Sequence, residues 1–592
     1  MKNERTAQQN IDILVDQAER LGVIGSPSST SELTLDILGS AVTRKLVGEL
    51  ALFRFSQDAC QHYALGQITE VLLRNIWHED PTMRSLIRQR GRVDPVSERQ
   101  DTHSGKMTIS AVFGKLAQGE LEPSLLGTVP STGTFIHIVD DRVLNALLNL
   151  YRDQLFYMGH VYGSKPLLPL WFKHFDHGPQ GAGEAYHLGI FGKTGSGKSV
   201  LAKMILLAYA RHPSMAILVI DPQGEFSKDI RSGRGTGEFA LPLGELLKGL
   251  KRPIATLSVQ SLVLDRWELF EQILYESPFF ERLSMPKGEN RQIACNILIE
   301  RLKDKRKIAL KSVNERTSFD VAWEILNDPD VQQVIYRSLE SRGRFNAALQ
   351  AADKEDFFAI WTKIAGLFHG GENKRTVDAA LSWLLSSSAK DSPRPLLIID
   401  LSREQAQGAY WNDHIQELVI KRLLDGLTQT AESHFKDEKS LNALVIIDEA
   451  HRLAPRSHSR DDAGNHGIRR ALVDAARTTR KYGLGWLFIS QTLSSIDTEI
   501  ISQMRILFFG FGLALGQEYE SLRQLVGSSA SALDLYRLFR DPHSAFSVSS
   551  RQYSFMTVGP VSPLSFAGTP LFFNVFGTVD KFIEANQFKL PQ

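Results

Sequence analysis

The sequence predicts an α/β protein with a parallel sheet, a helical insertion and a separate β domain on the amino-terminal side. The main observation is a set of short apolar runs that are typical of buried parallel strands, each near a helical pattern. These runs are HLGIFG (187–192), MAILVID (215–221), PLLIID (395–400), ALVIID (443–448), LGWLFIS (484–490) and RILFFGF (505–511). A second observation is the glycine-rich turn at 192–199, which lies between the first run and a helical stretch at 199–212.

At 592 residues the chain is longer than one hydrophobic core usually serves, so several domains are expected. Residues 5–24 have the apolar spacing of an amphipathic helix, and the segments 67–77 and 142–155 look helical within a region of short alternating strands. The predicted parts are a helix and linker (1–31), a β-barrel domain (32–173), a linker (174–186), a sheet domain in two pieces (187–257 and 391–560), a helical insertion between them (258–390) and a C-terminal segment (561–592).

Composition narrows the function classes. Lys and Arg number 68 against 67 Asp and Glu, so any contact with nucleic acid must come from local groups. The polar start has no signal-peptide pattern and no apolar run is long enough to span a bilayer, so we expect a cytoplasmic protein without a membrane anchor. The two cysteines, Cys60 and Cys295, form no disulfide framework or metal-ligand spacing.

The strongest motif is the run of Gly192, Lys193, Thr194, Gly195, Ser196, Gly197, Lys198 and Ser199, which matches G-x-x-x-x-G-K-S between a strand and a helix. In this P-loop the glycines let backbone N–H groups turn inward around the phosphates of ATP at a helix N-terminus. Lys198 is expected to reach the β and γ phosphates and Ser199 to bind Mg²⁺. The alternative is a glycine-rich strand-to-helix turn without a ligand.

A P-loop site needs acidic and polar groups at other strand ends. Asp448, at the end of a buried strand, is expected to orient a magnesium-bound water, and Glu449 to act as the general base. Gln491, just past another buried strand, is placed to sense the γ-phosphate through water. The alternative for the acidic pair is a cap of the helix that follows.

The letters Asp448-Glu449-Ala450-His451 also spell the signature of a class of RNA helicases. Such a helicase needs a second nucleotide-binding domain after its signature, whereas only 144 residues follow Asp448 here. With a single P-loop domain, a neighbouring subunit can supply the charge that stabilises the transferring phosphoryl group. Arg477, Arg480 and Lys481 are the candidates, and a solvated helix face is the alternative for them.

Four stretches together resemble the HerA–FtsK group of ring ATPases, and specifically its HerA branch. They are GKTGSGKS (192–199), IDPQGEF (220–226), VIIDEAHRLAP (445–455) and ARTTRKYGLGWLFISQ (476–491). The resemblance implies a RecA-like P-loop core, an N-terminal HAS-barrel, and a homo-hexamer that hydrolyses ATP at subunit interfaces. It further implies movement on double-stranded DNA with a partner nuclease or other effector, as in end-resection and antiphage defence modules.

The chain departs from that family at two places. Thr492-Leu493 stand where many relatives have Arg-Pro, and Gln223 stands where His is usual. These differences bear on DNA contact and coupling more than on ATP hydrolysis.

Three functions remain at this point. The first is an ATPase of the helicase type that translocates on double-stranded DNA, and the second is a nucleotide-gated scaffold that regulates an effector enzyme. A conjugation-type coupling ATPase is disfavoured because no membrane segment is expected. For DNA contact we predict a flexible loop over 454–470 with Arg456, Arg460, Arg469 and Arg470, for which a solvated surface loop is the alternative, and we expect 301–311 to be the wet face of an inserted helix.

Overall fold

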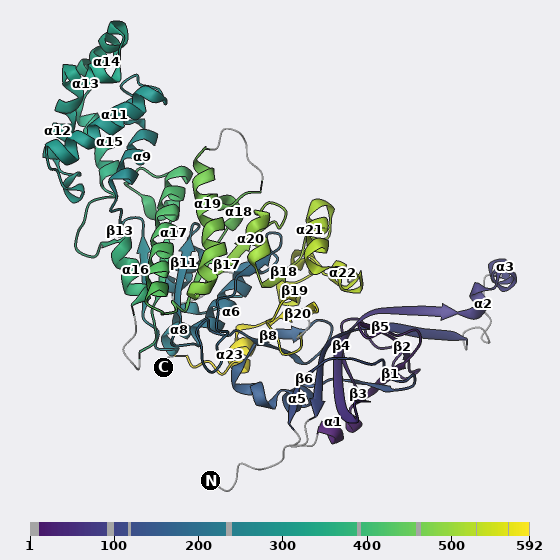
Figure 1. The fold of residues 1–592 in the computed structure, drawn as a ribbon. Coiled ribbons are helices and arrows are strands. Elements are labelled where there is room, and N and C mark those ends of the chain that lie inside the picture. Colours follow the sequence, from purple (N-terminus) through teal and green to yellow (C-terminus); the bar gives the residue numbers. More distant parts are fainter. Residues whose placement is uncertain are drawn as a thin grey trace.

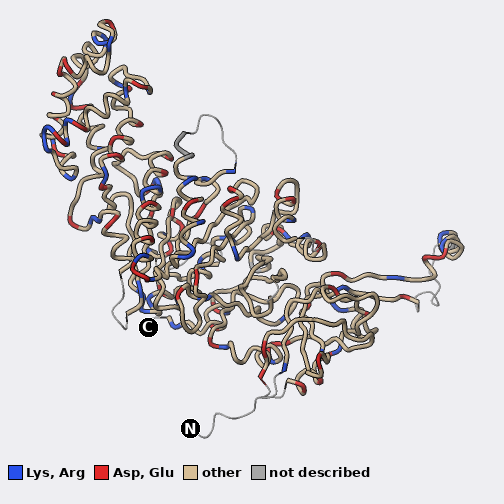
Figure 2. The backbone as a smooth tube through the Cα atoms, in the orientation of Figure 1, with Lys and Arg blue, Asp and Glu red and all other residues tan. Residues whose placement is uncertain are grey.

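The computed structural model describes residues 11–90, 100–115, 120–232, 239–386, 392–456, 463–527, 530–565 and 568–590. Figure 1 shows a central sheet covered by helices, a small β-barrel on one side of it and a helical lobe that projects from the other. This arrangement confirms the predicted fold class. Lys and Arg are interspersed with Asp and Glu over all three parts (Figure 2).

The central sheet has eleven strands in the order β12-β15-β11-β16-β17-β10-β18-β19-β20-β8-β9. The pairs from β12 to β18 are parallel, and those from β18 to β9 are antiparallel. The parallel strands are β10 (Leu188–Phe191), β11 (Ala216–Asp221), β12 (Ile254–Ser258), β15 (Leu396–Asp400), β16 (Ala443–Ile447), β17 (Leu484–Ser490) and β18 (Ile506–Phe509). The antiparallel strands are β8 (Leu155–Val161), β9 (Leu167–Trp171), β19 (Ser554–Val558) and β20 (Leu571–Val575).

Each face of this sheet has its own hydrophobic core. Along β11, Leu218 and Ile220 belong to one core and Ile217 and Val219 to the other, because successive side chains of a strand point to opposite faces. One face is covered by α17 (Asp413–Lys436) and α19 (Ala463–Thr478), and the other by α6 (Lys198–Ala210) and α8 (Leu243–Gly249). Burial on both faces explains why these strands are continuous apolar runs.

The central sheet extends beyond the ranges predicted for it. Strands β8 and β9 lie within the range assigned to the barrel, and β20 lies within the predicted C-terminal segment, yet all three pair in this sheet. Helix α23 (Val579–Ala585) follows β20, and Asn586 after it hydrogen-bonds the backbone of Tyr157 in β8. The chain end is therefore attached to the strands that enter the sheet first.

The amino-terminal domain is a barrel in which β2-β1-β7-β3-β4-β5 are joined in order and closed by pairing of β2 with β5, with β6 added beside β5. Its strands are β1 (Arg20–Ile24), β2 (Glu32–Ile37), β3 (Leu50–Gln57), β4 (Cys60–Asn75), β5 (Asp101–Lys115), β6 (Leu121–Ser124) and β7 (Phe135–Ile138). Helix α5 (Asp141–Leu147) and a 3₁₀ turn (Asn149–Gln154) confirm the helical segment predicted at 142–155.

The helix predicted over 5–24 is wrong in its second half. Helix α1 covers Ile11–Gln17, and Arg20–Ile24 instead form β1 between β2 and β7. Gly22 permits this pairing, since a β-carbon there would lie 2.5 Å from the carbonyl oxygen of Asp36. Pairing with two neighbouring strands thus overrides the helical pattern of these residues.

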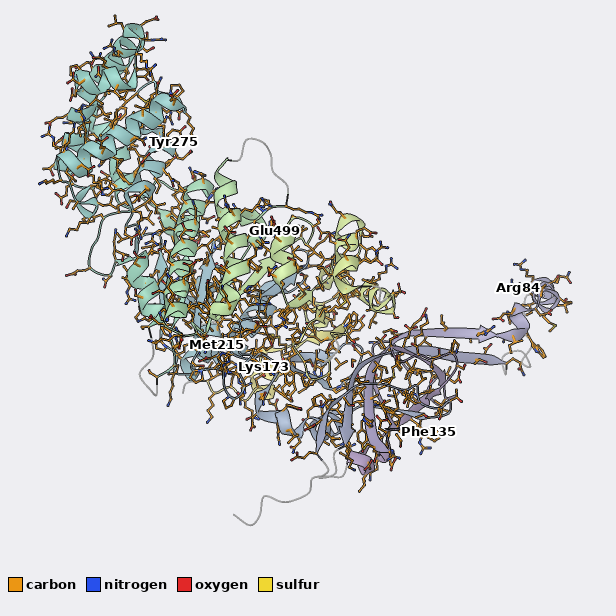
Figure 3. All side chains as sticks on the ribbon, viewed as in Figure 1. Arg84, Phe135, Lys173, Met215, Tyr275 and Glu499 are labelled. Atoms are coloured by element: carbon orange, nitrogen blue, oxygen red, sulfur yellow. The ribbon has the colours of Figure 1, made fainter. Side chains whose placement is uncertain are left out.

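The helix predicted at 67–77 is also wrong, because β4 continues without a break to Asn75. Strands β4 and β5 extend together beyond the barrel as an arm, which carries α2 (Ile76–Glu79) and α3 (Pro81–Arg90) at its tip, near the labelled Arg84 in Figure 3. Cross-strand contacts such as the 2.9 Å ion pair between Glu70 and Lys106 stabilise the strand. Val71, Leu72, Leu73 and Ile76 are nevertheless exposed on this arm.

The helical lobe is the insertion predicted over 258–390, and Tyr275 marks it in Figure 3. Its main elements are α9 (Trp267–Glu276), α10 (Pro278–Glu281), α11 (Glu289–Glu300), α12 (Arg316–Asn327), α13 (Pro329–Ile335), α14 (Leu339–Ala351) and α15 (Lys354–Ala365), with the short strand pair β13 (Leu262–Val263) and β14 (Arg375–Thr376) at its base. Trp361 lies fully buried at its centre and donates a 2.8 Å hydrogen bond to the carbonyl of Val313. The last helix of the insertion, α16 (Val377–Leu385), contacts α17 and β11 of the sheet domain.

Two remaining findings concern the surface. The side chains of 303–307 are exposed, in the segment expected to be a wet helix face. Within the described ranges, no helix has the length and apolar character needed to cross a membrane.

Candidate functional site

Three neighbouring strands bring the predicted site residues to one edge of the sheet. In the order β16-β17-β10, Asp448 and Glu449 follow the end of β16, Gln491 follows β17 and the P-loop follows β10. Because these strands are parallel, their carboxyl ends meet at the same edge. Such an edge is where ligands bind in open α/β sheets.

The P-loop has the backbone shape that its glycines permit. Gly195 has φ 81° and Gly197 has φ 90°, both in the left-handed region that favours glycine. The loop is held at its base, since Lys193 N donates to the carbonyl of Phe511 at 3.0 Å and Ser196 N donates to the carbonyl of Lys193 at 3.1 Å. Gly197 then occupies the N-cap position of α6, so the loop leads directly into free N–H groups of a helix N-terminus.

Lys198 and Ser199 are the first two residues of α6. The Nζ atom of Lys198 donates to the carbonyl of Lys193 at 3.1 Å, which holds the ammonium group against the loop. Burial lowers the pKa of Lys198, and the nearby carboxylates of Glu449 and Asp448 act in the opposite direction. A cation partly withdrawn from water and facing two acids is suited to binding the phosphates of a nucleotide.

Asp448 is buried at the end of β16. Burial, followed by the nearby carboxylates of Glu225, Glu449 and Asp221, raises the pKa of Asp448 to about 7, although its carboxylate accepts a 2.9 Å hydrogen bond from Glu449 N. Glu449 itself has φ 52°, an unusual left-handed conformation for a residue with a side chain. Backbone conformations of this kind tend to occur at functional sites.

A chain of hydrogen bonds joins the P-loop to the acidic pair. Thr194 Oγ1 donates to Gln491 Oε1 at 3.0 Å, and Gln491 Nε2 donates to Glu449 Oε1 at 2.9 Å. The second carboxylate oxygen of Glu449 lies 3.2 Å from Nδ1 of His451. One oxygen of the candidate general base is therefore oriented by Gln491, whereas the other lies near His451 without a hydrogen bond among the described residues.

Sequence reasoning missed one acidic residue of the site. Glu225 begins α7 (Glu225–Ser232) just after β11, and its carboxylate contributes more than that of Glu449 to raising the pKa of Asp448. The bend before α7 is fixed by Asp221, whose carboxylate accepts hydrogen bonds from Gly224 N and Ser227 N at 2.9 Å each. The signal was the DPQGEF segment after the strand that pairs with β16.

The residues present fit a magnesium-bound nucleotide. Glycines form the loop, and acids gather opposite one lysine, so a divalent cation would offset the burial and the repulsion that together raise the pKa of Asp448. Within the described part of the chain, no three His, Cys, Asp or Glu side chains form a complete metal cage. Mg²⁺ seldom uses such a cage, because it keeps several waters and takes phosphate oxygens together with one or two protein ligands. Ser199 and Asp448 would be those ligands.

The two candidate arginines lie away from their own P-loop. Arg477 is in the last turn of α19, where it pairs with Glu499 at 3.1 Å, and Arg480 lies four residues before β17, where it pairs with Glu184 at 3.5 Å. Strand β17 has seven residues, so its two ends are about 20 Å apart. Arg480 is thus at the opposite edge of the sheet from Lys198, and neither arginine joins the acidic cluster.

The flexible loop predicted over 454–470 is wrong from residue 463 onward, because α19 begins there. Arg469 is held by an ion pair with the buried Asp497, whereas Arg470 is exposed beside Asp474. Arg456 is exposed after α18 (Ala450–Leu453), and Arg460 lies outside the described residues. The helical packing of Ile468 and Leu472 against the core explains the difference.

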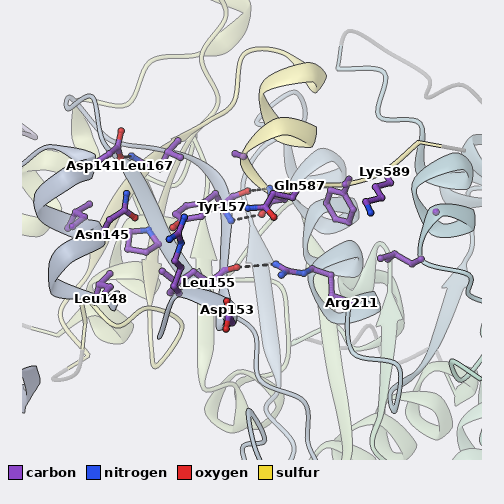
Figure 4. Close-up of a pocket in the computed structure, with 18 residues that line it drawn as sticks. Asp141, Asn145, Leu148, Asp153, Leu155, Tyr157, Leu167, Arg211, Gln587 and Lys589 are labelled. Atoms are coloured by element: carbon purple, nitrogen blue, oxygen red, sulfur yellow. Dashed lines mark hydrogen bonds between the residues drawn. The ribbon is translucent and has the colours of Figure 1, made fainter. Parts of the chain in front are cut away.

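A cavity of about 600 Å³ lies elsewhere, between α5, β8, β9 and the chain end (Figure 4). Arg211, directly after α6, lines it and donates a 3.0 Å hydrogen bond to the carbonyl of Leu155. Because Arg211 and Lys198 lie at opposite ends of α6, this cavity is separate from the P-loop edge.

Comparison with known proteins agrees with this geometry. Residues 185–424 match the family model described as the central domain of helicase HerA. This part of the chain is similar to a HerA-type central domain, and the matched range includes the P-loop, β11, the helical insertion and β15. Among curated proteins, no sequence matches this chain.

Several solved structures are similar to the chain at low identity. VirB4 of Thermoanaerobacter pseudethanolicus is 16% identical over 71% of this chain and 96% of its own, with a TM-score of 0.36. The bacterial conjugative coupling protein TrwB is 13% identical over 69% of this chain and 87% of its own, with a TM-score of 0.34. The genome packaging NTPase B204 of Sulfolobus turreted icosahedral virus 2 is 10% identical over 66% of this chain and 98% of its own, with a TM-score of 0.28.

Proposed function

We propose that this protein is an ATP-hydrolysing ring motor, a homo-hexamer that translocates on double-stranded DNA and works with a partner nuclease or other effector. The observation that carries the ATPase part is the hydrogen-bonded connection from Thr194 through Gln491 to Glu449. It joins the phosphate-binding loop to a carboxylate placed to activate water. Lys198 would bind the phosphates, Ser199 and Asp448 would hold Mg²⁺ with its bound water, and Glu449 would accept a proton from the attacking water.

The ring is supported by the position of the two candidate arginines. Arg477 and Arg480 lie toward the far edge of the sheet from the P-loop of their own chain. If either arginine stabilises the transferring phosphoryl group, it does so at the site of a neighbouring subunit, and ATP is then hydrolysed at subunit boundaries. A mass measurement in solution with ATP and Mg²⁺ tests the hexamer directly.

DNA contact is assigned to local groups, because the charges of the chain are balanced and interspersed (Figure 2). Arg456, after α18, and Arg470, within α19, are both exposed. Such arginines follow phosphates without reading bases. Arg469 is not assigned to this role because Asp497 binds it.

The test is the ATPase rate measured without DNA, with single-stranded DNA and with double-stranded DNA at several salt concentrations. Double-stranded DNA should stimulate the rate, and added salt should weaken the stimulation. Arg456→Ala with Arg470→Ala should reduce stimulation while leaving the basal rate unchanged. Arg344→Ala on α14, an exposed arginine of the helical lobe, is the matched control. No stimulation by any DNA would contradict the motor.

A nucleotide-gated scaffold is the second candidate, and the arm of β4 and β5 favours it. Leu73 in β4 is 62% exposed and Ile76 in α2, at the tip of the arm, is 65% exposed, and exposed apolar surfaces of this kind are usually covered by another protein. If the scaffold is correct, ATPase activity should respond to the effector protein and remain indifferent to DNA. Both proposed functions are compatible with a role in antiphage defence or DNA-end processing.

A further inference from the structure

The nucleotide site has an open side that its catalytic residues do not occupy. Glu449 and Gln491 come from β16 and β17, on one side of β10 in the sheet, so the γ-phosphate end of a bound triphosphate faces that side. On the other side of β10 lie β18 and then β19. A phosphate chain bound along the P-loop, with its γ-phosphate toward Glu449, would extend its nucleoside toward β18 and β19.

A segment that precedes β19 reaches the P-loop from that second side. Strand β19 is antiparallel to β18 and pairs Met556 with Phe509, so its first residues lie at the same edge as the P-loop. Tyr553, directly before β19, packs against Gly197, where a β-carbon would lie 2.8 Å from its ring atom Cδ1. The imidazole of His543 packs closer still on Gly195, where a β-carbon would lie 2.1 Å from Nε2.

Both rings are held in place by their own backbone contacts. The carbonyl of Tyr553 accepts a 2.8 Å hydrogen bond from Val575 N in β20. His543 lies in a 3₁₀ turn (Pro542–Ser544) that is capped by Asp541, whose carboxylate accepts from His543 N at 2.9 Å. The two rings therefore stand beside the two left-handed glycines of the loop as fixed features.

We propose that Tyr553 and His543 form the nucleoside-binding wall of the site and position the nucleobase of the bound nucleoside triphosphate by ring contact. The proposal rests on the proposed ATPase function and adds residues that neither the P-loop nor the acidic pair supplies. Flat rings suit this role, because every base offers a π-face for stacking. Both residues belong to segment 540–553, so this part of the chain would recognise the nucleoside.

The experiment compares the affinities of the full-length protein for MgATP and for magnesium tripolyphosphate, which has the phosphates and no base. Tyr553→Ala should weaken MgATP binding about tenfold, the range expected for loss of one stacking contact. It should leave tripolyphosphate binding unchanged, and His543→Ala should act in the same direction. Tyr553→Phe keeps the ring and should restore MgATP binding.

Phe546→Ala is the matched control, because Phe546 belongs to the same segment and is fully exposed. It should change neither affinity. Equal weakening of both ligands by Tyr553→Ala would show that the ring only supports the P-loop, and unchanged MgATP binding would show that the base lies elsewhere. Either result overturns the proposal. Failure of the wild-type protein to bind MgATP would instead contradict the proposed ATPase site itself.

Discussion

Gln491 binds Glu449 through a 2.9 Å hydrogen bond from its Nε2 atom to Oε1 of the carboxylate. The other end of the same amide accepts a 3.0 Å hydrogen bond from Thr194 in the P-loop. A change at the phosphate-binding loop is therefore transmitted through one side chain to the group that is placed to activate water.

Gln491→Ala should lower the ATP turnover number about tenfold or more with little effect on nucleotide affinity. Glu449 would remain but lose the contact that aims it, and positioning of a general base is worth part of the 10²–10⁴-fold that such a base contributes. Steady-state ATPase kinetics and nucleotide titration together measure this. Gln503→Ala, on α20 (Thr498–Gln503), is the control. Unchanged turnover would remove Gln491 from the site.

Glu449→Gln should retain ATP binding and lose hydrolysis by about 100-fold or more, because the amide keeps the shape of the side chain and cannot accept a proton. Single-turnover hydrolysis and equilibrium binding of ATP separate the two effects. Glu404→Gln, an exposed glutamate paired with Lys228, should leave both unchanged. Loss of binding and hydrolysis to the same degree would assign Glu449 to binding.

Asp448→Asn should raise the midpoint of thermal unfolding of the nucleotide-free protein at pH 8 and change it little at pH 4. The pKa of Asp448 is raised in the folded state to about 7 from an ordinary value of 3.8, so folding disfavours the ionised carboxyl. The native protein therefore loses stability as pH rises from about 4 through 7, and an amide removes that loss. Calorimetry across this range measures it, with the exposed Asp425→Asn as control. A difference of the opposite sign would refute this environment for Asp448.

Arg477 or Arg480 should act on the neighbouring subunit. A variant with Ala at both positions should bind ATP and hydrolyse it slowly, because the lost charge matters mainly in the transition state. Mixed with Lys198→Ala subunits, it should regain part of the activity, since some boundaries then pair an intact P-loop with an intact arginine. ATPase rate against mixing ratio, after subunit exchange is verified, is the measurement. Inactivity at every ratio would exclude action across a boundary.

The sequence predicted the parallel strands well because burial on both faces makes them continuous apolar runs. It failed where pairing or packing between distant segments decides the structure. Residues 67–75 have helical spacing, but β5 holds them in a strand, and 463–470 look like a polar loop, but Ile468 anchors a helix.

In the candidate site, too, the sequence predicted local patterns and missed contacts between distant segments. The P-loop and the acidic pair are local patterns that the sequence displays. The contact of Tyr553 with Gly197 joins residues far apart in the chain, and no local pattern announces it.

The most direct test of the motor is ATP-dependent displacement of a third strand from a triplex at the end of a long DNA duplex. A protein that moves along double-stranded DNA should displace the third strand with wild-type Lys198, and neither Lys198→Ala nor Glu449→Gln should do so. Displacement should stop when ATP is replaced by an analogue that is not hydrolysed. ATP hydrolysis by the wild-type protein without any displacement, on duplex DNA that it binds, would contradict translocation and leave the nucleotide-gated scaffold.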